Sequence, residues 1–144
     1  MNLSYRQAQP ADIPLLARMN QDLRDDEQSH WQLTLPQLED RMRTMLSQGY
    51  TAVLFELDTV PVAFALYRPT EGGVHLRQFF VERAYRRQGI GREAIGLLLT
   101  HIWPPQTRIT LDVLSHNQTG YAFWQSLGFR DYAITLERLP DTTT

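Results

Sequence analysis

The stretch that decides the fold is Arg86-Arg87-Gln88-Gly89-Ile90-Gly91-Arg92. It follows a strand-like run, VHLRQFFV at 74–81, and it opens a helix-like run, GIGREAIGLLLTHIW at 89–103. Small residues at a helix start let a phosphate reach backbone N–H groups that have no partner inside the helix. With the flanking arginines, the stretch predicts a pyrophosphate-binding turn. The alternative is that the two glycines only permit close packing of helix and sheet.

A dinucleotide-binding interpretation competes for the same glycines. The run from Gly89 to Ala94 matches that fingerprint, and Asp112 follows Gly91 by 21 positions. However, the fingerprint needs its glycines directly after the first strand, and the residues ERAYRRQ separate Val81 from Gly89 here. Asp112 also falls inside a predicted strand. We therefore do not adopt this interpretation.

Periodicity and turn signals extend the pattern along the chain in both directions. We expect a first strand at 3–8, helices at 12–26 and 34–49, strands at 50–57, 61–68 and 74–81, a helix from 89, a strand at 108–114, a helix at 117–127 and a last strand around 132–139. Thr34 and Gln37 have the spacing of a capping box. The order β-α-α-β-β-β-α-β-α-β predicts an α/β fold with a mixed, mostly antiparallel central sheet flanked by helices.

Composition limits the domain organisation, the partners and the chemistry. The 144 residues suit one domain, expected over 1–140, with 141–144 a disordered tail. A net charge of −2 argues against nucleic acid as a partner. All fourteen cations are arginines and there is no cysteine, which excludes Schiff-base, P-loop lysine and thiolate chemistry. No apolar run approaches the length of a membrane span, so we expect no membrane partner and a cytoplasmic protein.

Two motifs resemble those of the GNAT superfamily of N-acyltransferases. The pattern Arg86-x-x-Gly89-x-Gly91, after a strand that ends FFV, is similar to the acyl-CoA motif of that superfamily. The segment NQTGYAFWQSLGF at 117–129 resembles its later motif, in which an Asn opens a helix and Gly-Phe follows. The two motifs lie at the right separation, and the expected element order matches the family fold over essentially the whole chain.

The resemblance implies a binding site for acetyl-CoA. It assigns the CoA pyrophosphate to the backbone of Gln88, Gly89, Ile90, Gly91 and Arg92, with Arg86 and Arg87 as flanking cofactor-binding residues. It assigns the pantetheine to Phe79, Phe80 and Val81, and the far wall of the site to Asn117 and Trp124. Taken out of this context, Asn117 is better interpreted as an ordinary helix cap, and Phe123 and Trp124 as ordinary core residues.

Proton transfer is where the sequence departs from the family pattern. The strand stretch that often holds an acidic base reads Leu76-Arg77-Gln78, and Trp124 occupies the usual position of a tyrosine acid. Tyr121 is the nearest substitute acid. Asp22, Asp25, Asp26 and Glu27 end the first helix; they form either a rim that attracts a cationic amine, with Asp26 and Glu27 as candidate bases, or a solvated charge run partly paired with Arg24.

The four histidines do not predict a metal site. His30, His75, His101 and His116 lack metal-ligand spacing, and His30 and His75 remain further candidate bases. The sequence thus predicts direct transfer of an acetyl group from acetyl-CoA to a primary amine of a small molecule or peptide, in a protein for which a homodimer is open. The alternative is a noncatalytic CoA-sensing module on the same fold.

Overall fold

The computed structural model describes residues 2–29 and 31–141. Two compact units make up the chain, one from residue 1 to 114 and the other from 115 to 144. Among the described residues, the first unit contains a five-stranded sheet, three α-helices, two 3-10 turns, η1 (Pro10–Asp12) and η2 (Arg83–Tyr85), and a π-helical turn, η3 (Leu98–Ile102), that continues α3. Its strands are β1 (Leu3–Gln7), β2 (Thr51–Leu57), β3 (Val60–Thr70), β4 (Gly73–Val81) and β5 (Arg108–Thr110), and its helices are α1 (Ile13–Asp26), α2 (Leu35–Ser47) and α3 (Ile90–Leu97). The second unit contains α4 (Gln118–Ser126).

The sheet is mixed, as the sequence predicts. Its order is β1-β2-β3-β4-β5, with antiparallel pairing as far as β4 and parallel pairing between β4 and β5. A register shift between β3 and β4 pairs Leu66 with Gln78 and Tyr67 with Leu76, so Arg77 forms a bulge. A bulge bends its strand and redirects a side chain.

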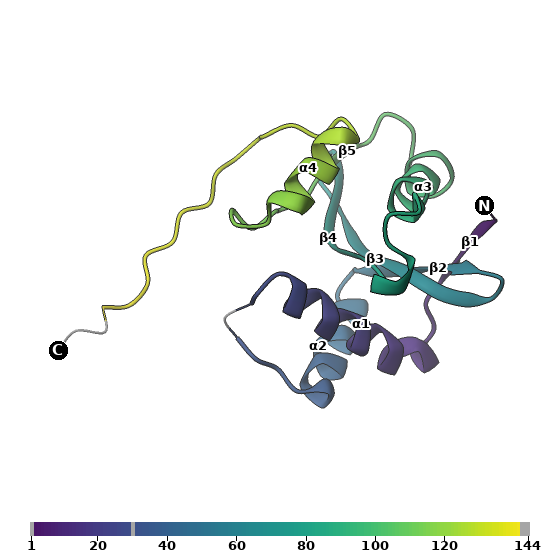
Figure 1. The fold of residues 1–144 in the computed structure, drawn as a ribbon, viewed down its shortest axis with the longest axis horizontal. Coiled ribbons are helices and arrows are strands. Elements are labelled where there is room, and N and C mark those ends of the chain that lie inside the picture. Colours follow the sequence, from purple (N-terminus) through teal and green to yellow (C-terminus); the bar gives the residue numbers. More distant parts are fainter. Residues whose placement is uncertain (1, 30, 142–144) are drawn as a thin grey trace. The chain divides into compact units, whose positions relative to one another are not determined.

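Helices cover both faces of this sheet (Figure 1). On one face, Leu16 of α1 and Met42 of α2 pack in one buried cluster with Leu54, Phe64 and Phe80. Because side chains alternate along a strand, neighbours such as Val53 and Ala65 point to the other face, where α3 lies. The two expected caps form. Thr34 and Gln37 make the predicted capping box at α2, and the Asn117 side chain accepts from the Gly120 N–H at α4.

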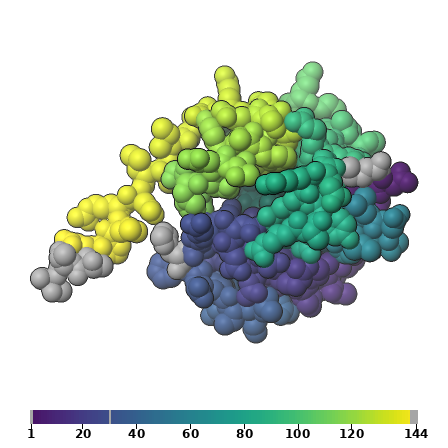
Figure 2. All heavy atoms as spheres, viewed as in Figure 1, coloured from purple at the N-terminus to yellow at the C-terminus, as the bar shows by residue number. Residues whose placement is uncertain are grey.

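The last expected strand does not form. Residues 129–141 contain neither helix nor strand, and Tyr132, Ile134 and Leu136 are 79%, 87% and 88% exposed. These residues, yellow in Figure 2, form an extended segment. Alternation shows which side chains a strand would bury, but a strand also needs a neighbour to accept its hydrogen bonds. β5 is likewise shorter than expected, three residues instead of the run 108–114.

The prediction of a disordered tail at 141–144 falls almost entirely on residues 142–144, which lie outside the described residues. Among the residues described, no helix is both long enough and apolar enough to cross a membrane.

Candidate functional site

The turn from β4 into α3 has the backbone geometry of an anion cradle. Gly89 is the N-cap of α3 with φ +79°, a conformation that glycine adopts without strain, and Arg87 also has a positive φ of 62°. The first bond of the helix ladder runs from the Glu93 N–H to the Gly89 carbonyl at 3.0 Å. The N–H groups of Ile90 and Gly91 precede it and have no carbonyl one turn earlier within the helix. They are donors suited to a phosphate.

A short 3-10 helix, η2 (Arg83–Tyr85), connects the end of β4 to this turn. Phe80 is 2% exposed and belongs to the core, while Phe79 and Val81 are only partly buried. The Arg86 side chain folds back over this end: its Nε donates to the Val81 carbonyl at 2.8 Å, and its guanidinium lies 5.2 Å from the centre of the Phe80 ring. Arg86 therefore anchors the turn to the strand.

Asp26, at the end of α1, is held by two arginines from that turn region. Its Oδ1 lies 2.9 Å from Arg83 Nη2, and its Oδ2 lies 2.6 Å from Arg86 Nη2. Burial by itself would raise the pKa of Asp26, but the hydrogen bonds from Arg86 and Arg83 outweigh it, so the pKa lies below its ordinary value. A carboxylate of lowered pKa is a weaker proton acceptor.

The other acidic residues at the end of α1, Asp22, Asp25 and Glu27, differ in their surroundings. Asp22 is 3.0 Å from Arg18, which also binds Glu82 at 3.0 Å. Asp25 lines a pocket, and Glu27 is partly buried. The charge run is therefore neither a fully open rim nor a simply solvated face.

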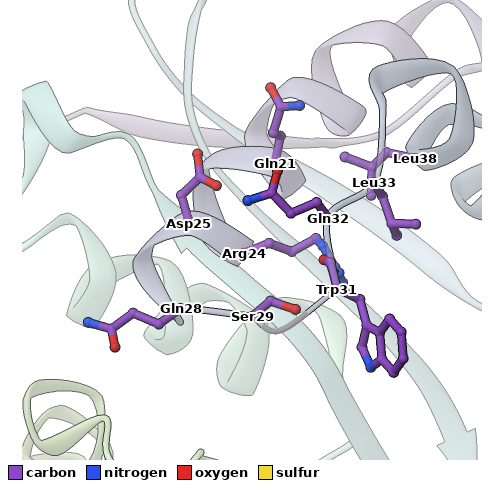
Figure 3. A pocket seen from close by; sticks show the side chains of 9 residues that line it. All are labelled: Gln21, Arg24, Asp25, Gln28, Ser29, Trp31, Gln32, Leu33 and Leu38. Atoms are coloured by element: carbon purple, nitrogen blue, oxygen red, sulfur yellow. The ribbon is translucent and has the colours of Figure 1, made fainter.

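The pocket lies between the end of α1 and the loop that leads to α2, and it has a volume of about 430 Å³ (Figure 3). Arg24 reaches across it from α1 and donates a hydrogen bond to the Trp31 carbonyl. Its lining is completed by polar and apolar side chains: Gln21, Asp25, Gln28, Ser29, Trp31, Gln32, Leu33 and Leu38. The candidate base His30 lies outside the described residues. Sequence reasoning missed this pocket, because a loop has no periodicity to read.

The remaining predicted residues belong to α4 in the second unit: Asn117 is its N-cap, and Tyr121 and Trp124 lie within it. The Tyr121 hydroxyl donates to Asp131 Oδ1 at 2.6 Å, and this hydrogen bond, followed by burial, raises the pKa of Tyr121. Trp124 lies 4.9 Å from Phe123 and 5.3 Å from Phe129, measured between ring centroids and with edge-to-face geometry. Asn117 caps the helix.

His75 is the other candidate base. Its Nδ1 lies 2.8 Å from the Thr110 hydroxyl, and its Nε2 lies 3.7 Å from Asp112, which places it at the pairing of β4 with β5. In the described part of the chain, no three histidine or acidic side chains gather closely enough to hold a metal ion.

Sequence reasoning also missed an arginine group around Tyr50. The Tyr50 hydroxyl accepts from Arg68 Nε at 3.1 Å and from Arg77 Nη1 at 3.2 Å. The two guanidinium groups lie 5.8 and 5.6 Å from the centre of its ring. The bulge that turns Arg77 toward Tyr50 leaves no signal in a single sequence.

Comparisons with known proteins identify the family of this chain. A model of the acetyltransferase (GNAT) family matches residues 16–129. No curated protein matches the sequence.

Solved structures give the same fold. A possible acetyltransferase from Clostridium difficile 630 has a TM-score of 0.76 at 17% identity, over 99% of this chain and 100% of that one. The aminoglycoside N-acetyltransferase AAC(6')-Iy in complex with CoA has a TM-score of 0.72 at 15% identity, over 96% and 95%. The ribosomal-protein-S18-alanine N-acetyltransferase from Escherichia coli has a TM-score of 0.70 at 21% identity, over 98% and 86%. Since the family model spans most of the sequence, the chain belongs to the acetyltransferase (GNAT) family.

Proposed function

We propose that the protein transfers an acetyl group from acetyl-CoA directly to a primary amine in a ternary complex. The observation that carries the proposal is the turn from β4 into α3, where left-handed Gly89 places the Ile90 and Gly91 amides at the start of a helix. Such a turn binds a pyrophosphate through backbone donors and the positive end of the helix dipole. Family membership supplies the activity class.

Each element of the donor site has a separate role in this proposal. The backbone from Gln88 to Arg92 binds the pyrophosphate, and the end of β4 from Phe79 to Val81 binds the pantetheine. Arg86 is a positioning residue, because its side chain is engaged by Val81 and Asp26. For Asn117 and Trp124, the proposal keeps the role that the family resemblance implies, which is the far wall of the acetyl-CoA site.

The reaction forms a bond from the amine nitrogen to the thioester carbonyl carbon and breaks the bond from that carbon to sulfur. The amine loses a proton and the departing thiolate gains one. Deprotonating an amine of pKa 10.4 at pH 7 costs about 4.6 kcal/mol, while releasing a thiol of pKa 8.5 as the unprotonated thiolate costs only about 2 kcal/mol. The base therefore matters more than the acid.

The proton carriers are assigned on the same grounds. Glu27 and Asp26, which end α1, are the proposed bases, and the ion pairs with Arg83 and Arg86 make Asp26 the weaker proton acceptor. Tyr121 is the proposed acid. The raised pKa of Tyr121 makes it a weak acid, and a weak acid suffices because a thiolate that leaves unprotonated costs only about 2 kcal/mol at pH 7.

The acceptor is proposed to be a small molecule or peptide. The named acceptors of the two similar enzymes, an aminoglycoside and ribosomal-protein-S18 alanine, differ widely and select neither for this chain. We further propose that residues 1–140 act as one functional domain, in the cytoplasm, without nucleic acid or membrane partners. The proposal also includes association of two copies of this chain as a homodimer.

The experiment is release of free thiol from acetyl-CoA in the presence of a panel of amines, with mass spectrometry of the acetylated product. Time-dependent release that requires both protein and amine supports the enzyme. Binding of acetyl-CoA without release, across the panel, would instead identify a CoA-sensing module. Binding of NADH as tight as that of acetyl-CoA would contradict the assignment of the turn.

A further inference from the structure

The arginine group around Tyr50 has the composition of an anion site. Two guanidinium groups, from Arg68 on β3 and Arg77 on β4, donate to the same phenol oxygen. A phenol oxygen has two lone pairs, and these two bonds use both. The O–H of Tyr50 therefore remains as a third donor beside two positive charges.

No carboxylate of the described residues lies within ion-pair distance of Arg68 or Arg77. The acidic residues of the neighbouring helix are engaged elsewhere, since Glu39 and Asp40 both bind Arg43 at 3.6 and 2.7 Å. Like charges this close repel one another and favour a bound anion. Burial alone would raise the pKa of Tyr50, but the hydrogen bonds from Arg77 and Arg68 lower it overall.

Two more arginines connect this group with the pocket at the end of α1. Arg41 is partly buried on α2, one helical turn after the pocket residue Leu38. Burial, and then the charges of Arg24 and Arg77, lower the pKa of Arg41. Arg24 itself lines the pocket (Figure 3). The positive charges therefore extend from Tyr50 to the pocket.

The group is separate from the pyrophosphate turn. Arg77 precedes Val81 by four residues on β4, which is about 13 Å along an extended strand. An anion at Arg77 is thus a different group from a pyrophosphate at Gly89–Arg92. Asp25, which lines the pocket together with Arg24, offers a partner for an ammonium group. A ligand with both charges fits this combination.

We propose that Tyr50, Arg68 and Arg77, extended by Arg41 and Arg24, bind an anionic group of the acceptor, so that the acceptor is an amine that also carries a carboxylate or phosphate. This inference rests on the proposed acetyl transfer. It adds an anionic group to the amine acceptor that the sequence predicts. Guanidinium groups bind planar carboxylates and phosphates through paired hydrogen bonds.

The test compares acceptors that differ only in the anionic group. Glycine, diglycine and triglycine are each assayed as free acid and as amide, at equal concentrations of unprotonated amine, by thiol release from acetyl-CoA. Phosphoethanolamine and ethanolamine form the phosphate arm. The variants are Arg68→Gln, Arg77→Gln and Tyr50→Phe, and the control is Arg43→Gln, which removes an exposed charge already paired on α2.

In at least one pair, we expect kcat/KM for the anionic acceptor to be at least about tenfold higher than for its uncharged counterpart. A hydrogen bond to a charged group contributes an effect of this size. That ratio falls toward one in Arg68→Gln and Arg77→Gln, falls less in Tyr50→Phe, and is kept in Arg43→Gln. The arm with the larger ratio identifies carboxylate or phosphate. Equal rates in every pair, or a ratio that survives both arginine substitutions, would overturn the proposal.

A binding measurement separates this inference from the proposed function. If acetyl-CoA binds but no amine is acetylated, the enzymatic proposal fails by itself. The anion site is then decided by calorimetry of N-acetylglycine, N-acetyltriglycine and inorganic phosphate with CoA-saturated protein. Binding of any one that is lost in Arg77→Gln supports the site, and no binding of any of them contradicts it.

Discussion

Asp26 at the end of α1 and Arg86 in the turn after β4 are joined by an ion pair with 2.6 Å between Oδ2 and Nη2. The same Arg86 donates to the Val81 carbonyl, so one side chain links the helix, the strand end and the turn. Sixty residues separate the two partners along the chain. The pair thus fixes the position of the proposed pyrophosphate turn against α1.

Removing the Asp26 charge should loosen that link. We expect Asp26→Asn to lower the free energy of unfolding by about 1 kcal/mol, as for a partly exposed charge network, and to weaken acetyl-CoA binding severalfold. Chemical denaturation and calorimetry measure the two effects. The control is Asp40→Asn, because the Asp40 carboxylate is 78% exposed and pairs with Arg43 of its own helix, α2. Equal effects of the two substitutions would contradict the role of Asp26.

Asp12 should make stability depend on pH in the acid range. Arg6 donates to both of its oxygens at 2.8 and 2.9 Å, and Arg6, opposed by burial and aided by the Gln9 N–H, lowers the pKa of Asp12 from 3.8. A lowered folded pKa contributes stability above pH 3.8, which is lost as the pH falls through the folded value. We therefore expect Asp12→Asn to cost about 1–2 kcal/mol at pH 7.

The measurement is the difference in unfolding free energy between the protein and Asp12→Asn from pH 7 to pH 2. That difference should shrink below pH 3.8. A constant difference over the whole range would show that the Asp12 charge contributes nothing.

The turn between β2 and β3 contains a residue poorly suited to its backbone. Asp58 and Thr59 have φ values of 48° and 68°, and a β-branched residue in this region is strained. We expect Thr59→Gly to raise the free energy of unfolding by about 0.5 kcal/mol, as relief of strain exceeds the entropy that glycine adds to the unfolded chain. Asp58→Asn, which keeps a residue tolerant of positive φ, should be neutral. A loss of stability in Thr59→Gly would disprove the strain.

Tyr121 is proposed as a weak acid, and its removal should have a bounded effect. We expect Tyr121→Phe to lower kcat by no more than about a hundredfold with little change in acetyl-CoA affinity. The kinetics are measured by thiol release with any acceptor that the panel identifies. Asp131→Asn serves as the comparison, because it removes the negative charge from the hydrogen-bond partner that raises the pKa of Tyr121 and keeps an acceptor oxygen. A loss of acetyl-CoA binding in Tyr121→Phe would indicate a structural role instead.

Local signals in the sequence predicted most elements of the first unit. The capping box of Thr34 and Gln37 and the glycine start of α3 depend only on residues a few positions apart, so they are readable directly. The alternation at 132–139 has the same local character, yet no strand forms there, because pairing depends on a neighbour far away in the sequence.

The same reasoning explains what was missed in the site. The partners of Asp26 lie 57 and 60 residues away, so its role as an anchor was hidden in an acidic run. Arg77 reaches Tyr50 through a bulge, and Tyr50, Arg68 and Arg77 come from three separate segments. Motif resemblance predicts the proposed donor side, whereas the proposed acceptor side depends on the three-dimensional arrangement.

The most direct test of the central claim is calorimetric titration of acetyl-CoA into the protein, Gly91→Val and Gly96→Val. Gly91 lies in the first turn of α3, and a branched side chain there blocks phosphate approach to the backbone, whereas the left-handed Gly89 would suffer strain if replaced. Gly96 is the control, since a Cβ there meets no atom within 4 Å. We predict binding at least about tenfold weaker in Gly91→Val, with both variants folded and Gly96→Val unchanged. Unchanged acetyl-CoA affinity in folded Gly91→Val would contradict the account.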